Sequence, residues 1–253
     1  MLHCKRTARR GFSLVEMLVV VGIITVLIAM LLPALVAMRE HAKQTNCLSN
    51  LRQLGIAYQL YASNYDDQIP LGYINNGGNN NEIWTGYMIY DGANYPLMGA
   101  MYKARLLANP QAFYCPSQID ARWQFATPQN PWPPPVPGTL IRVGYTSRPT
   151  VAWSNGVPVT PMSRRANFGN LAILADIVGI PADSPDYTNV HHQSLNVLYG
   201  DGSAHSVDKA SYNAIQLQIE GYNSTGSNPP PPLLYLNTAN PNAVALWNEF
   251  DHG

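Results

Sequence analysis

The sequence predicts an α+β protein in which one long N-terminal helix packs on a small antiparallel β-sheet. An uncharged apolar stretch comes first, and a one-sided helical pattern follows it. Short strand-like segments separated by turn residues lie in the C-terminal half. The composition agrees with a folded core, because 46% of the residues are hydrophobic and only 12% are charged.

The charge is unevenly distributed, although the formal net charge of the 253 residues is zero. Lys5, Arg6, Arg9 and Arg10 precede the apolar stretch, and no acidic residue accompanies them. The remaining chain lacks the basic surface that a nucleic-acid-binding protein needs. Basic residues in front of an apolar helix are typical of a chain whose N-terminus stays in the cytoplasm while the rest is exported.

The apolar stretch is long enough to cross a membrane. Met17 to Met38 contains 22 residues without a charge. As a helix it would be roughly 33 Å long, against about 30 Å for a bilayer core. A plain signal anchor fits this length better than a secretory signal peptide, whose apolar region is about 7–15 residues. Leu35-Val36-Ala37 would still serve as a late cleavage site.

Glu16 indicates a third interpretation. A carboxylate at membrane depth is normally paired or functional, unless it reaches water at the headgroup level. The surrounding residues read Arg9-Arg10-Gly11-Phe12-Ser13-Leu14-Val15-Glu16-Met17-Leu18. This segment resembles the prepilin peptidase site of type IV pilins and type II secretion pseudopilins.

The resemblance implies processing and assembly. Cleavage would fall between Gly11 and Phe12, and the new amino group of Phe12 would be methylated. Glu16 would pair with the amino group of a neighbouring subunit, and Pro33 matches a helix-breaking proline common in these proteins. From the residues alone, a kink at Pro33 without an assembly role is an equal alternative. The implied partners are prepilin peptidase, other pilin or pseudopilin subunits and the inner membrane.

Beyond Met38 the helix becomes amphipathic. Apolar residues recur at alternating spacings of four and three, which places them on one helical face. They are Cys47, Leu51, Leu54, Tyr58, Tyr61 and Tyr65. We therefore expect one helix from about Ser13 to about Ala62, and its polar residues, such as Gln44, Asn50 and Arg52, can face water.

The strand candidates lie between Gly- and Pro-rich loops. They are Thr139 to Thr146, Leu171 to Ile177, Leu195 to Tyr199 and Ser203 to Asp208. Asp201-Gly202 separates the last two and predicts a tight hairpin turn. A short helix is expected over Ala210 to Glu220.

The cysteines suggest a disulfide. Cys4 belongs to the leader, which leaves Cys47 on the helix and Cys115 in the loop region. An even pair in an exported chain favours a bond between them, and two buried free thiols are the alternative.

A second resemblance rests on Cys47 to Gly55, on Cys115-Pro116-Ser117, and on His191 followed by Asp201-Gly202. Together they are similar to a large pseudopilin-like family of planctomycetes and related bacteria, which carries an H-x9-DG motif near its C-terminus. We expect His191, Asp201 and Gly202 to be structural, with no metal or other cofactor. A calcium site at Asp201 and Asp208 is the alternative.

The chain is thus expected to divide into a leader, a membrane and assembly helix, its amphipathic continuation and a globular domain. The boundaries are 1–11, 12–38, 39–65 and 66–253, with the hairpin motif at 191–202. No enzyme motif is recognised. We expect a pilin-like subunit of a type II secretion pseudopilus or type IV pilus-like filament. It would be held in the bacterial inner membrane with its globular domain in the periplasm, or at the cell surface in a pilus. The alternative is an exported enzyme or carbohydrate-binding protein on a prepilin-like anchor.

Overall fold

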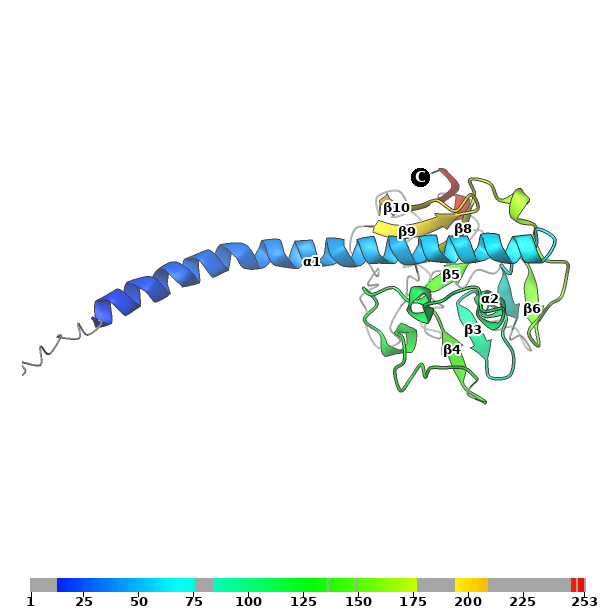
Figure 1. Cartoon of the computed structure of the whole chain (residues 1–253), viewed down its shortest axis with the longest axis horizontal. Coiled ribbons are helices and arrows are strands. Elements are labelled where there is room, and N and C mark those ends of the chain that lie inside the picture. The colour runs from blue at the N-terminus through cyan, green and yellow to red at the C-terminus, as the bar shows by residue number, and fades with distance from the viewer. Residues whose placement is uncertain are drawn as a thin grey trace, which may run out of the picture. The chain divides into compact units, whose positions relative to one another are not determined.

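The structure is a computed structural model (Figure 1). It describes residues 13–75, 84–135, 137–148, 150–176, 194–208, 247–248 and 250–252. The chain divides into two compact units, Met1–Ala42 and Lys43–Gly253, with the boundary inside the long helix. We call the second unit the head.

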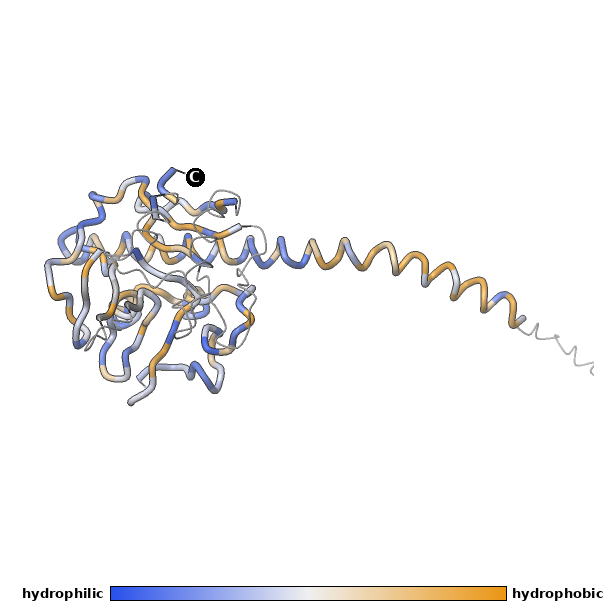
Figure 2. The backbone as a smooth tube through the Cα atoms, turned by 180° about the vertical axis from the view of Figure 1, so that it is seen from behind, coloured by the Kyte–Doolittle hydropathy of each residue, from blue (hydrophilic) through white to orange (hydrophobic). Residues whose placement is uncertain are grey.

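Helix α1 runs from Leu14 to Asn64 and confirms the predicted long helix. Pro33 lies inside it, and the helix continues through this residue. Its first part is apolar on every side and its second part is mixed, as Figure 2 shows by hydropathy. The α1 residues buried in the head are Cys47, Leu51, Leu54, Gly55, Ala57, Tyr58, Tyr61 and Ala62.

This buried set matches the predicted face except at Tyr65. Tyr65 is exposed, because α1 ends at Asn64 and the chain turns away at Asp66 and Asp67, which both have positive φ. The Tyr65 ring instead stacks on Tyr61, with 4.2 Å between the ring centroids.

The main sheet of the head has four antiparallel strands in the order β10-β9-β8-β5. They are β5 (Tyr145–Ser147), β8 (Ala172–Asp176), β9 (Ser194–Tyr199) and β10 (Ala204–Asp208). β9 and β10 form the predicted hairpin, with His205 opposite Val197. The α+β class and the small antiparallel sheet are therefore confirmed.

Two further sheets are smaller. The first has the order β2-β1-β6-β7, and the second pairs β3 with β4. Their strands are β1 (Tyr73–Asn75), β2 (Trp84–Thr85), β3 (Met88–Asp91), β4 (Leu140–Arg142), β6 (Ala152–Ser154) and β7 (Val157–Pro158). The β1–β6 pair is parallel, which the sequence did not predict. Helix α2 (Met98–Lys103) and the 3₁₀ turns Pro110–Phe113, Ala121–Trp123 and Arg165–Asn167 complete the described head.

The prediction of one continuous strand over Thr139 to Thr146 is wrong, because this segment forms two strands, β4 and β5. At the break, the N–H groups of Val143 and Gly144 donate to the carbonyls of Tyr87 and Phe113. A Cβ on Gly144 would lie 2.6 Å from the backbone nitrogen of Cys115, so this crossing between sheets requires glycine. The predicted helix over 210–220 lies outside the described residues.

The C-terminal residues close one end of the main sheet. Arg148 follows β5, and its guanidinium forms two hydrogen bonds of 2.8 and 3.0 Å with the Asp251 carboxylate. Asp251 also accepts the N–H of Ala172, and Arg148 donates to the Ala172 carbonyl. Trp247 and Phe250 are buried. We call the Arg148–Asp251 contact the C-terminal clasp.

Candidate functional site

The predicted processing site, Gly11 and Phe12, lies outside the described residues. The first described turn of α1 is a capping box. The Ser13 hydroxyl accepts the N–H of Glu16 at 3.2 Å, and the Glu16 carboxylate accepts the N–H of Ser13 at 2.8 Å. The Ser-x-x-Glu spacing ahead of an apolar run is a readable signal for this contact, which the sequence-based prediction missed. Glu16 is thereby held at the start of the helix.

The first half of α1 exposes mainly apolar side chains, with Glu16 and Thr25 as polar exceptions. Its large side chains from Leu14 to Met38 are exposed. By length and composition, α1 is the one helix among the described residues that could cross a membrane. Pro33 lies within this segment.

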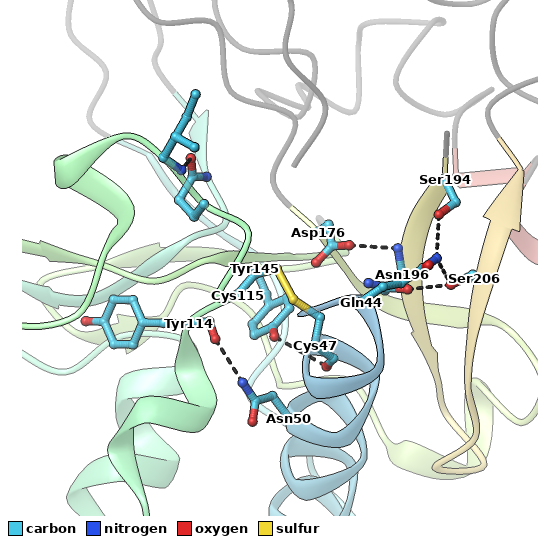
Figure 3. The surroundings of a disulfide bond; sticks show 12 residues. Gln44, Cys47, Asn50, Tyr114, Cys115, Tyr145, Asp176, Ser194, Asn196 and Ser206 are labelled. Atoms are coloured by element: carbon cyan, nitrogen blue, oxygen red, sulfur yellow. Dashed lines mark hydrogen bonds between the residues drawn. A yellow bond between two sulfur atoms is a disulfide. The ribbon is translucent and has the colours of Figure 1, made fainter. Parts of the chain in front are cut away.

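The two predicted cysteines are joined (Figure 3). Cys47 and Cys115 form a disulfide with 5.1 Å between their Cα atoms, and both residues are buried. The alternative of two free thiols is therefore wrong. The bond ties α1 to the turn that follows Phe113, and Asn50 reinforces it by donating to the carbonyl of Tyr114 at 2.9 Å.

Asp176 lies beside this bond. Its carboxylate and both sulfur atoms lie within 4.8 Å of one another, and Asp176 is fully buried. Two cysteines and an aspartate could ligate a metal ion, but sulfur atoms bonded to each other provide no thiolate. Burial, and then the Asp176 charge, raise the pKa of the neighbouring Tyr145 well above its usual value.

Polar side chains of α1 bind the β9–β10 hairpin along one line of the helix. Gln44 donates to the hydroxyls of Ser194 and Ser206 at 2.7 and 2.8 Å. Arg52 donates to the carbonyl of Ala204 at 3.2 Å, and Gln59 donates to that of Asp201 at 3.3 Å.

The expectation that these polar side chains can face water holds for Arg52, which is exposed, and in part for Gln44 and Asn50, which are half-buried, but all three also bind the head. Their partners are distant in sequence, so the helical pattern alone could not identify them. The spacings of eight and seven residues between Gln44, Arg52 and Gln59 were the available signal.

The Asp201-Gly202 turn has a structural explanation. The Asp201 carboxylate accepts the N–H of Ser203 at 2.8 Å, and hydrogen bonding to Ser203 lowers the pKa of Asp201. Gly202 has φ 91°, and a Cβ there would lie 2.5 Å from Nε2 of Gln59. The turn thus needs glycine for its backbone conformation, whereas the flexible end of the Gln59 side chain could move away from a Cβ.

The structure does not bring Asp201 and Asp208, the residues of the calcium alternative, together. Asp201 lies in the turn, whereas Asp208 lies at the far end of β10 opposite Ser194. The five-residue strand β10, about 13 Å long, lies between the turn and Asp208, which is too far for the two carboxylates to share one ion. His191, the third residue of the predicted motif, lies outside the described residues.

Comparison with known proteins finds two family models on this chain. Residues 6–32 match the prokaryotic N-terminal methylation motif. Residues 36–157 match a family described as a protein of unknown function, DUF1559. No curated protein and no solved structure matches the chain. Residues 6–32 thus carry a prepilin-type methylation motif, and the second half of α1 with the adjoining part of the head resembles DUF1559, the planctomycete-type pseudopilin-like family.

Proposed function

We propose that this pilin-like chain is a structural subunit that assembles through α1 into a type II secretion pseudopilus or a type IV pilus-like filament. The observation that carries the proposal is the methylation motif at residues 6–32, which includes the first part of a helix of 51 residues. A helix that is apolar on every side in its first half and carries a folded head on its second half suits an anchored, polymerising subunit.

Prepilin peptidase is the proposed processing enzyme. Cleavage after Gly11 would leave a positively charged amino group at Phe12, next to the apolar helix. A buried ammonium needs a carboxylate partner. Glu16 lies at the same end of α1, and its carboxylate already accepts an N–H group there. We propose that Glu16 pairs with the amino group of a neighbouring subunit and so sets the stagger between subunits.

The proposed location follows from the same features. The basic residues before Gly11 stay in the cytoplasm, the apolar half of α1 crosses the inner membrane, and the head lies in the periplasm or on the cell surface. An oxidising compartment suits the disulfide between Cys47 and Cys115. We propose that the head serves assembly and not catalysis.

The first test is the mass and N-terminal sequence of the protein isolated from the membranes of its native host. The proposal predicts a chain that begins at N-methylated Phe12. A chain that begins at Met1 or near Met38 would contradict it.

The second test concerns Glu16. Glu16→Gln keeps the size of the side chain and removes its charge, so it should abolish incorporation into filaments while the head unfolds at the same denaturant concentration. Glu40→Gln is the matched control on the same helix and should assemble normally. Equal assembly of both variants would reject the proposed role of Glu16.

A third test separates assembly from an enzymatic or carbohydrate-binding head. A version that lacks residues 1–38 should be monomeric and should show neither hydrolysis nor retention on an array of cell-wall polysaccharides. Retained binding or turnover in this version would place the function in the head.

A further inference from the structure

The surroundings of the disulfide contain a buried acid that filament assembly does not use. Asp176 is the last residue of β8 and is 0% exposed. Figure 3 shows it beside the Cys47–Cys115 bond, and its carboxylate and both sulfurs lie within 4.8 Å of one another. The two cysteines are themselves 0% and 3% exposed.

The sheet fixes the position of this carboxylate. Its Oδ2 accepts the backbone N–H of Asn196 at 2.8 Å, from the neighbouring strand β9. The Asn196 side-chain oxygen accepts the Ser206 hydroxyl of β10, and Gln44 of α1 donates to that same hydroxyl. β9 thus binds Asp176 directly, and β10 and α1 hold the Asn196 side chain through Ser206.

Exchange of a disulfide with a thiol places negative charge on the sulfurs. An external thiolate attacks one cysteine sulfur and forms a mixed disulfide, while the Cys47–Cys115 bond breaks and its electron pair leaves on the other sulfur as a thiolate. A second thiol then releases the first cysteine, so the protein gains two electrons and the external dithiol becomes a disulfide. A nearby carboxylate in a buried site opposes the charge that develops on the leaving sulfur.

We propose that Asp176 protects the Cys47–Cys115 disulfide against thiol exchange by electrostatic repulsion of the leaving thiolate. The bond that ties α1 to the head is then kinetically resistant to external dithiols, including the thiol–disulfide oxidoreductases of an oxidising compartment. This inference does not depend on filament assembly, and it holds or fails on the redox behaviour of the folded head alone.

The test is the rate at which dithiothreitol reduces the full-length protein in detergent under native conditions. Asp176→Asn preserves the side-chain shape and an oxygen that can accept the Asn196 N–H. Without the charge, reduction should become at least about tenfold faster. Tris(2-carboxyethyl)phosphine should show the same ratio, because its reaction also expels a cysteine thiolate.

A looser structure would also speed reduction, so the control must loosen the site and keep the charge. Gln44→Ala removes two hydrogen bonds from the same network and leaves Asp176 in place. Hydrogen exchange of the β8 and β9 amides measures local opening in both variants. In Asp176→Asn, the proposal requires that the rate of reduction rise by a larger factor than the rate of hydrogen exchange. In Gln44→Ala, the two rates should rise by the same factor.

A second readout concerns the reduced protein. The pH dependence of iodoacetamide alkylation should give a higher thiol pKa for Cys47 and Cys115 in the wild type than in Asp176→Asn. Unchanged or slower reduction of Asp176→Asn would overturn the proposal, and slower reduction would indicate that Asp176 gives a proton to the leaving sulfur. An acceleration equal to that of hydrogen exchange would overturn it as well.

Discussion

The two halves of α1 share one backbone and differ in everything that their side chains touch. From Leu14 to Met38, each large apolar side chain is between 45% and 81% exposed. From Cys47 to Ala62, one face of the same helix is buried, and Gln44, Arg52 and Gln59 on its flank bind the β9–β10 hairpin. Both halves are α-helical, so the side-chain pattern decides which partner each half requires.

The disulfide belongs only to the head half, and its removal should have the largest effect. Cys47→Ala should lower the free energy of unfolding of the head by about 4 kcal/mol, because the bond closes a loop with a sequence separation of 68. Urea unfolding followed by Trp fluorescence measures this loss. Wild-type protein reduced under unfolding conditions should match the variant, and a loss below about 1 kcal/mol would contradict the prediction.

The same truncation in each half sharpens the comparison. Leu54 is 0% exposed, whereas Leu27 is 55% exposed. Leu54→Ala should destabilise the head by about 3 kcal/mol, because it leaves a cavity in a packed core. Leu27→Ala should leave urea unfolding of the head unchanged. Comparable losses in the two variants would show that the halves are energetically coupled.

Two glycines of α1 should respond to alanine with opposite signs. A Cβ on Gly22 would meet no atom within 4 Å, so Gly22→Ala should stabilise the helix by about 1 kcal/mol. A Cβ on Gly55 would lie 3.0 Å from Leu198 and 3.4 Å from Gly202. Since Leu198 is fully buried and cannot withdraw, Gly55→Ala should cost about 1 kcal/mol.

Circular dichroism during heating in detergent measures helix loss in both glycine variants. Trp fluorescence reports the head separately. A gain in stability for Gly55→Ala would mean that the β9–β10 hairpin shifts freely along the helix.

The smallest effect is expected at the start of α1. Ser13→Ala removes one half of the capping box and should weaken the first turn by about 1 kcal/mol. Hydrogen exchange of the amides of residues 14–17 in detergent should accelerate about fivefold, while urea unfolding of the head stays the same. Ser13→Thr should restore slow exchange, and equal exchange in all three proteins would exclude the capping role.

Local patterns were sufficient to predict much of this molecule. The spacing of Cys47, Leu51, Leu54 and Tyr58 predicted the buried face of α1, and Asp201-Gly202 predicted the hairpin turn. The cysteine pairing followed because only two cysteines remain after the leader. Each of these features depends on neighbouring residues or on a very small number of alternatives.

The remainder depends on contacts between distant segments. The parallel pairing of β1 with β6 joins strands of three residues each, and such short segments carry little pattern of their own. The sequence pattern identifies Asp176 only as a polar residue at the end of a strand. Its position beside the disulfide results from the folded sheet. The Arg148–Asp251 contact likewise joins residues 103 positions apart.

The C-terminal clasp can form only at the end of synthesis, because its two residues are far apart in the chain. Arg148 leaves the ribosome 103 residues before Asp251. At about 5–20 residues per second, this interval lasts about 5–20 s. Ala172 is made within this interval, and its N–H group lacks the Asp251 carboxylate until residue 251 follows, whereas Arg148, the partner of its C=O group, is already made. The helix is therefore made first, and the contacts that join residue 251 to β8 and Arg148 form last.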